Sequence, residues 1–161
     1  MSNPNIDSYP PLSPYLAVND AARAIDFYKE AFGATERYRL TDSTSGNIGH
    51  AELVINGSLV MLSEEFPGFS PSPRTLGGTP LKFCLVVENS DVAFNRAIAA
   101  GATEVRAVTD EFYGFRSGTV RDPFGYEWML QHEIEKVSPE EMQKRWDEMV
   151  KDCQGAGEPT A

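Results

Sequence analysis

The residue pair with the clearest chemical potential is His50 and Glu52, which lie two positions apart in the apolar run 48–55. Alternate residues of a strand share a face, and a carboxylate beside an imidazole can orient it as a general base. A polar pair next to a glycine on a strand is more often a surface pair, and the sequence favours that interpretation. Glu127, on a later strand-like run, is a further acid–base candidate.

Two other residues have both a chemical and a structural interpretation. Arg116 could bind an anionic group through its guanidinium fork, or it could be a structural tie to Asp110 or Asp122. His132 is expected to end the last strand and anchor the C-terminal extension. No glycine-rich phosphate loop, nucleophile elbow or Cys/His cluster occurs in the sequence.

A duplicated tetrapeptide shows how such residues are positioned. Gly-Ala-Thr-Glu occurs at 33–36 and again at 101–104, and the same offset of 68 residues relates Met61 to Met129. A third block, 16–20 against 85–89, matches at an offset of 69. A period this long indicates two similar half-domains rather than a solenoid.

Each half shows the same order of elements. The first has a strand at 12–18, a helix capped by Asn19 or Asp20 and ended by Gly33, and strands at 36–40, 48–55 and 58–63, the last two joined by the turn Asn56-Gly57. The second has a strand at 81–87, a helix from about Ser90 to Gly101 with Val92, Phe94, Ala97 and Ile98 on its apolar face, and strands at 103–108, 116–121 and 126–131. The sequence therefore predicts two βαβββ modules.

The expected organisation is one domain with short additions at each end. Residues 1–11 form an N-terminal segment and residues 12–133 the domain, with modules at 12–65 and 81–133. The proline-rich stretch 66–80 is a linker or a loop over a site. Residues 134–161 form a C-terminal helix and tail, in which Ser138-Pro-Glu-Glu is a capping box. The apolar stripe of this helix is expected to dock on its own domain, with a dimer contact as the alternative.

Composition excludes several classes of protein. The 161 residues are 41% hydrophobic and 24% charged, which is typical of a globular chain, and no apolar run approaches bilayer length. A net charge of −10 argues against nucleic acids and anionic membranes as partners. With no signal-peptide pattern at Met1, a cytoplasmic protein is expected. Cys84 is expected to be a buried small hydrophobe.

Paired βαβββ modules and two sequence segments carry a family resemblance. The segments are Ala-Ile-Asp-Phe-Tyr-Lys-Glu-Ala-Phe-Gly at 24–33 and the run from Phe112 to Trp128, which contains Asp-Pro-Phe-Gly-Tyr-Glu-Trp. The chain resembles the vicinal oxygen chelate superfamily, which contains glyoxalase I, extradiol dioxygenases and bleomycin-resistance proteins. The segment 132–141 resembles its PhnB-like branch. The resemblance implies an α+β fold with a cupped mixed sheet, and often a homodimer.

The resemblance also implies where a divalent metal would lie. Members that use a metal take one ligand from the first and the last strand of each module, and these positions correspond here to Ser13, Met61, Lys82 and Met129. Thioether and ammonium groups do not suit such a metal. No cofactor is therefore expected. A displaced metal site is the alternative, and its candidate ligands are His50, Glu52, Glu64 and His132.

Strand alternation then predicts the lining of the cup. Tyr126, Trp128 and Leu130 should lie under the helices, so that their neighbours face the cup. The sequence favours a protein that binds a small, partly apolar ligand, with a lyase, isomerase or dioxygenase as the alternative. The expected ligand-binding residues are Ser13, Tyr15, Met61, Ser63, Lys82, Tyr113, Arg116, Glu127, Met129 and Gln131.

Overall fold

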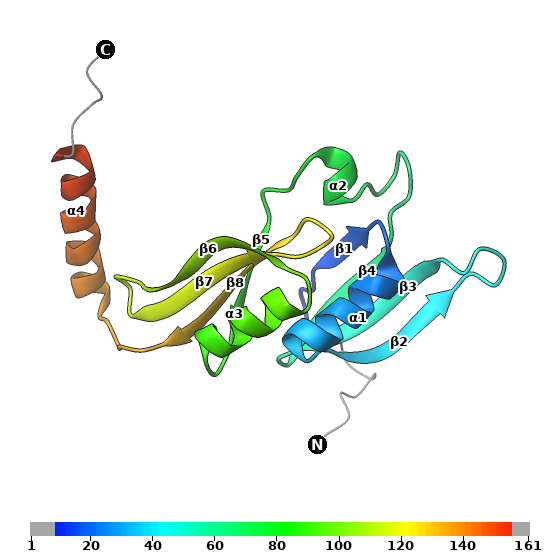
Figure 1. Ribbon diagram of the computed structural model, residues 1–161, viewed down its shortest axis with the longest axis horizontal. Helices are drawn as coiled ribbons and strands as arrows, with labels where there is room; N and C mark the ends of the chain where they lie inside the picture. Colours follow the sequence, from blue (N-terminus) through cyan, green and yellow to red (C-terminus); the bar gives the residue numbers. More distant parts are fainter. Residues whose placement is uncertain (1–8, 156–161) are drawn as a thin grey trace, which may run out of the picture.

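The computed structural model describes residues 9–155, with side chains up to residue 152. It contains two βαβββ modules (Figure 1). The first consists of β1 (Tyr15–Val18), α1 (Ala21–Phe32), β2 (Thr35–Thr41), β3 (Ile48–Ile55) and β4 (Ser58–Glu64). The second consists of β5 (Lys82–Val86), α3 (Ser90–Ala99), β6 (Thr103–Asp110), β7 (Phe115–Arg121) and β8 (Glu127–Glu133). The linker holds a short helix, α2 (Pro73–Leu76), and α4 (Pro139–Gly155) follows the second module.

Each module forms its own four-stranded mixed sheet. The strand orders are β1-β4-β3-β2 and β5-β8-β7-β6, in which only the pairs β1–β4 and β5–β8 are parallel. Tyr15 pairs with Met61 in the first sheet, as Cys84 pairs with Met129 in the second. α1 and α3 pack against each other next to the sheets (Figure 1). The predicted duplication and α+β fold are confirmed.

The predicted helix and turn signals have the expected geometry. The side chain of Asp20 caps α1 and that of Asn89 caps α3, each by accepting a backbone hydrogen bond. Gly33 ends α1 at φ 67°, a left-handed conformation that glycine adopts without strain. Asn56 and Gly57, at φ 45° and 80°, form the tight turn between β3 and β4.

Burial follows the predicted alternation in β8, but there are exceptions in both modules, and Ser63, which was expected to bind ligand, is only 2% exposed. Tyr126, Trp128 and Leu130 are buried. Ala51, Leu53 and Ile55 are buried as well. Two residues that were predicted to lie on the buried face of α3 are exposed instead: Val92 is 65% and Ile98 is 37% exposed. Cys84, which we expected to be buried, is exposed, because it lies on the face of β5 that no helix covers.

A buried carboxylate joins the two modules. Asp122, in the β7–β8 turn, accepts hydrogen bonds from the Tyr28 hydroxyl of α1 at 2.7 Å and from Trp128 Nε1 at 2.9 Å. It also accepts the backbone N–H groups of Phe124 and Tyr126, both at 2.9 Å. Burial raises the pKa of Asp122 although these hydrogen bonds oppose the shift. The β7–β8 turn at 122–125 therefore also fixes the orientation of α1.

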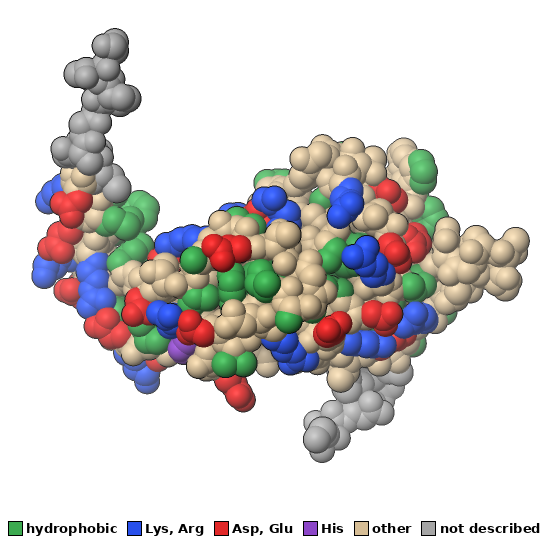
Figure 2. Space-filling model, viewed as in Figure 1, with side chains coloured by type: hydrophobic (Ala, Val, Ile, Leu, Met, Phe, Trp, Pro, Cys, Tyr) green, Lys and Arg blue, Asp and Glu red, His purple; other side chains and the backbone are tan. Residues whose placement is uncertain are grey.

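We expected α4 to dock on its own domain, but it does not. It projects away from the sheets at the β6–β7 end of the second module (Figure 1). Its attachments are the Arg145 ion pair with Glu135 at 2.8 Å and the ring contact of Trp146 with Phe112. Trp146 and Met149 remain 48% and 38% exposed, and Figure 2 shows hydrophobic side chains on the side of α4 that faces the sheets. The predicted start is confirmed, because Ser138 Oγ accepts the N–H of Glu141.

Candidate functional site

The open face of each sheet is defined here as the face that α1 and α3 leave uncovered. In the first module, Tyr15, Met61, Glu52 and Tyr38 are paired in one row across β1, β4, β3 and β2, so their side chains share this face. His50 lies next to Glu52 on the same side. The strand parity of the sequence analysis therefore agrees with the structure, and both residues of the chemical pair lie on the open face.

Glu52 is the centre of a hydrogen-bonded cluster, although its side chain is only 1% exposed. One carboxylate oxygen accepts the Tyr9 hydroxyl at 3.0 Å and the Tyr38 hydroxyl at 2.9 Å. The other lies 3.1 Å from Nη1 of Arg37, whose side chain is 3% exposed. A buried carboxylate needs such partners to remain charged. The simpler interpretation of Glu52 as part of a surface pair is therefore wrong.

Three members of this cluster were missed by the sequence analysis. Arg37 and Tyr38 are adjacent in β2, and in a regular strand their side chains would point to opposite faces. A register shift between Glu36 and Tyr38 interrupts the ladder with β3 and lets both residues reach Glu52. Tyr9 comes from the N-terminal segment, and its ring stacks with the Arg37 guanidinium. The Cζ atom of Arg37 lies 5.2 Å from the centre of the Tyr9 ring. Neither a bulge nor a packed terminus has a clear sequence signal.

His50 connects this buried cluster to the exposed part of the open face. Its Nε2 lies 3.4 Å from the Glu52 carboxylate, and its Nδ1 lies 3.1 Å from the hydroxyl of Tyr15. Tyr15 is 52% exposed and its ring packs beside the imidazole. If Nε2 carries the proton shared with Glu52, Nδ1 is the acceptor for Tyr15. The row Tyr15–His50–Glu52 can therefore pass a proton between an accessible hydroxyl and the imidazole.

The ionisation of Glu52 follows from two opposing influences. Burial alone would raise the pKa of this carboxyl group, but hydrogen bonds from Tyr38, Tyr9 and His50, together with the Arg37 charge, lower it overall. Hydrogen bonds to Tyr9 and Glu52 raise the pKa of Tyr38. Glu52 is therefore an anion that orients its neighbours, and Tyr38 is a neutral donor.

The open face of the second module carries a different charged group. Glu127 is bridged by Lys82 at 3.0 Å and by Arg121 at 2.7 Å. Arg121 and then Lys82 lower the pKa of Glu127. A carboxylate that two cations hold in its charged form is a weak proton acceptor, so Glu127 does not suit the acid–base role considered from the sequence. Met129 and Gln131 follow on β8, and the Gln131 side-chain oxygen is buried with no hydrogen-bond partner among the described residues.

Glu64 and His132, two candidates for a displaced metal site, are used elsewhere. Glu64 accepts a hydrogen bond from the backbone N–H of Ala21, and His132 Nδ1 accepts one from the backbone N–H of Ser90. Both therefore stabilise the N-terminus of a helix on the helix-covered side of the sheets. The structure does not bring them together with His50 and Glu52.

Arg116 and Tyr113, which were expected to bind ligand, also lie away from the first module's cluster. The Arg116 guanidinium is held by Asp91 of α3 at 2.7 Å and by Asp110 at 2.7 Å, which is the structural tie named as the alternative. The sequence gives no signal for the pairing with Asp91. Tyr113 lies in the β6–β7 loop, where its ring contacts Phe112 and Phe115.

The four positions at which the family resemblance implies a metal do not fit one. Met61 and Met129 offer thioethers, Lys82 is an ammonium already paired with Glu127, and Ser13 offers a neutral hydroxyl that has no hydrogen-bond partner among the described residues. Divalent ions bind carboxylate oxygen or imidazole nitrogen in preference to these groups. In the part of the chain that the structure describes, no three His, Cys, Asp or Glu side chains are grouped to hold a metal.

Comparison with known proteins gives the family. Residues 11–130 match the model of the Glyoxalase/Bleomycin resistance protein/Dioxygenase superfamily, and the chain belongs to this superfamily. It is 46% identical over 142 residues to an uncharacterised protein of Mycobacterium tuberculosis, covering 86% of this chain and 83% of that one. No described helix is long and apolar enough to cross a membrane.

Solved structures agree with this assignment. The crystal structure of a gene product from Arabidopsis thaliana, 30% identical, superposes with a TM-score of 0.61 and covers 76% of this chain and 98% of that one. A PhnB protein from Bacillus cereus has a TM-score of 0.61, with coverage of 76% and 99%. At 17% identity the latter similarity shows the fold alone. The resemblance to the superfamily and the α+β fold are thus confirmed.

Proposed function

We propose that this protein binds a small, partly apolar molecule on the open face of the first module, without the divalent metal that the family resemblance implies. The observation that carries this proposal is the cluster around Glu52, in which Tyr9, Tyr38 and His50 are held in place by hydrogen bonds to one buried carboxylate. Preorganised aromatic and polar groups favour binding because little side-chain freedom is lost. Tyr15 and Leu40, both more than half exposed, offer apolar surface beside the cluster.

The methionines of the chain make a direct test possible. Protein labelled with ¹³C at the methionine methyl groups would be titrated with a panel of aromatic carboxylic acids and aromatic amides. We expect the Met61 methyl to shift, because Met61 is paired with Tyr15 and Glu52, while Met142 and Met149 of α4 stay unchanged. Tyr15→Ala should weaken the same binding. Shifts confined to α4 would contradict the proposal.

The Tyr15–His50–Glu52 row favours a second candidate, a lyase or isomerase that works by acid–base chemistry. In this version Tyr15 receives a proton from the ligand while its own proton passes to His50, whose charge Glu52 stabilises. The test is exchange of ligand C–H protons in D₂O. Exchange that is lost in His50→Gln and kept in Glu127→Gln supports this class. No exchange with any compound that binds supports a binding protein.

We also propose that the protein is a homodimer. Two observations support a second copy as the partner: the open faces lie uncovered, and Trp146 and Met149 of α4 remain 48% and 38% exposed although α4 projects from the sheets (Figure 1). Light scattering should give twice the mass of the chain. A protein truncated before Ser138, which lacks α4, distinguishes the two possible dimer contacts. It should become monomeric if α4 forms the contact and stay dimeric if the open faces do. A monomeric full-length chain at micromolar concentration would contradict the proposal.

A further inference from the structure

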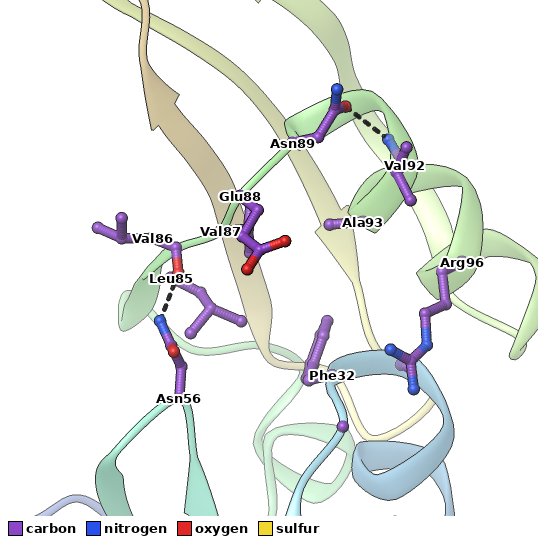
Figure 3. Close-up of a pocket in the computed structure, with 12 residues that line it drawn as sticks. Phe32, Asn56, Leu85, Val86, Val87, Glu88, Asn89, Val92, Ala93 and Arg96 are labelled. Atoms are coloured by element: carbon purple, nitrogen blue, oxygen red, sulfur yellow. Dashed lines mark hydrogen bonds between the residues drawn. The ribbon is translucent and has the colours of Figure 1, made fainter.

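The junction between the modules contains two clefts that the duplication relates. The first, the junction cleft, has a volume of about 710 Å³ and lies between the end of α1, the β3–β4 turn and the start of α3 (Figure 3). The second, the linker cleft, has a volume of about 640 Å³ and lies between the start of α1, the end of α3, the β7–β8 turn and the α2 linker. Each cleft combines the helix end and hairpin turn of one module with the helix start of the other.

Repeat-related residues line the two clefts. Gly33 lines the junction cleft and Gly101 the linker cleft, at the offset of 68, and the turn residues Asn56 and Gly125 come from equivalent hairpins. At the offset of 69, Val92 of the junction cleft corresponds to Arg23 of the linker cleft. The two clefts are built from equivalent elements but have different lining residues. The arginines of the linker cleft are therefore not needed to form the cleft.

Three arginines from three separate elements line the linker cleft. They are Arg23 of α1, Arg74 of α2 and Arg121 at the end of β7. The Arg23 guanidinium makes no hydrogen bond or ion pair with any other residue between 9 and 152, and Arg74 uses only its Nε, which donates to Pro123 O at 2.9 Å. Figure 2 shows Lys and Arg side chains around α2. Donor groups are therefore left over for a ligand.

The acidic residues at this cleft already have partners within the protein. Asp122 is buried and accepts its hydrogen bonds from the Tyr28–Trp128 side, within the core. Glu127 is shared between Lys82 and Arg121. Glu65, which does not line the cleft, accepts the N–H of Ser72 and the hydroxyl of Thr75. The cleft lining therefore holds three arginines against two acidic residues, in a chain of net charge −10.

The walls of the linker cleft are held at fixed positions. A Cβ at Gly125, which has φ +99°, would lie 2.9 Å from Cβ of Pro73, so the β7–β8 turn and α2 are in direct contact. Two hydrogen bonds to Glu65, from Ser72 and Thr75, also hold α2. The arginines are thus carried by a rigid frame, which reduces the entropy lost on binding. The linker, whose composition was compatible with a loop over a site, lies over this cleft.

We propose that the linker cleft binds the oxyanion of a small molecule, a phosphate or carboxylate group, through Arg23, Arg74 and Arg121. Guanidinium groups match both oxyanions through paired, charge-assisted hydrogen bonds. This site is separate from the open face of the first module, so it does not depend on the ligand proposed there. It would give the protein a second small-molecule site at the contact between its modules.

Titration of ¹⁵N-labelled protein tests this site. Inorganic pyrophosphate and succinate, each compared with sodium chloride at equal ionic strength, distinguish a phosphate from a carboxylate ligand. We expect at least one of them to shift the amide signals of Gly78, Gly101 and Gly125, which line the cleft, and to leave Gly46 unchanged. Arg23→Gln should weaken this binding about tenfold or more, since one charge-assisted contact is lost.

Arg106→Gln is the matched control. Arg106 is an exposed arginine of β6 that pairs with Glu111 and lies outside the cleft, so its loss should leave the affinity unchanged. Arg23 makes no side-chain hydrogen bond or ion pair with the residues that the structure describes, so the folding of Arg23→Gln should not be impaired. The proposal is overturned if neither anion shifts the cleft glycines, or if Arg106→Gln weakens binding as much as Arg23→Gln does.

Discussion

Glu64 and His132, which the repeat relates at an offset of 68 residues, hold the two helices in the same way. Glu64 accepts the backbone N–H of Ala21 at 2.9 Å, and His132 accepts that of Ser90 at 3.0 Å. The chemistry of the acceptor has diverged between the modules while its structural role is shared. Two residues that looked like candidate metal ligands are therefore helix caps in this structure.

Loss of the Glu64 cap should destabilise the fold. Glu64→Ala is expected to lower the free energy of unfolding by about 1 kcal/mol, because a helix N–H loses its acceptor. Glu64→Gln keeps an acceptor oxygen and serves as the control. Urea denaturation followed by circular dichroism measures both. Equal stability of Glu64→Ala and the unmodified protein would argue against the capping role.

The contact between Tyr28 and Asp122 should contribute strongly to stability. Tyr28→Phe removes one donor from a buried carboxylate and should cost about 1–3 kcal/mol. Tyr126→Phe is the comparison, because its hydroxyl donates to a neutral acceptor, Ala17 O, at 3.1 Å and its loss should cost less. Thermal and urea unfolding of both variants give the order. A larger loss for Tyr126→Phe would contradict our account of the junction.

Glu36 should make stability depend on pH at the acid end. Hydrogen bonds from Arg39 and Lys29 lower its pKa from 4.5 to about 2. A lowered folded-state pKa contributes stability that is present above pH 4.5 and lost as the pH falls towards 2. Glu36→Gln should flatten this part of the profile by about 1 kcal/mol, a value reduced for solvent screening.

The repeat supplies the control for this measurement. Glu104 is the equivalent residue of the second Gly-Ala-Thr-Glu, and it is exposed. Glu104→Gln should therefore leave the acid limb of the stability profile close to that of the unmodified protein. If the two variants change the profile equally, the ion pairs of Glu36 do not have the effect described.

The cluster around Glu52 should respond unequally to two substitutions. Glu52→Gln removes the negative partner of the buried Arg37 charge and is expected to cost about 3–5 kcal/mol. Tyr38→Phe removes one hydrogen bond and should cost about 1 kcal/mol. Denaturation at pH 7 compares them. A cost for Glu52→Gln no greater than that for Tyr38→Phe would show that the buried ion pair is not the centre of the cluster.

The sequence predicted local features well and long-range contacts poorly. The repeat, the Asp20 cap, the Gly33 helix end and the Asn56-Gly57 turn depend on a few neighbouring residues, and all are observed. Strand alternation correctly separated Met61 and Met129 from Trp128 and Leu130. The Tyr9–Glu52 contact and the β2 bulge depend on residues distant in sequence, and no local pattern indicates them.

The errors have physical causes of the same kind. Val92 and Ile98 have helical spacing, but α3 is covered by neighbours over only part of that face, so they remain exposed. The stripe on α4 has helical spacing as well, but spacing does not specify which surface covers it. The linker cleft needs four segments to meet, and only the tertiary structure brings Arg23 next to Arg74 and Arg121.

Elemental analysis of the purified protein, prepared without chelators, tests the central claim most directly. The claim is that the open face of this family member binds its ligand without a resident divalent metal, because Ser13, Met61, Lys82 and Met129 cannot hold one. We predict less than about 0.1 zinc, nickel, manganese or iron per chain, since sites of this composition do not retain such ions. A content near one metal per chain would contradict the claim and direct attention to His50 and Glu52.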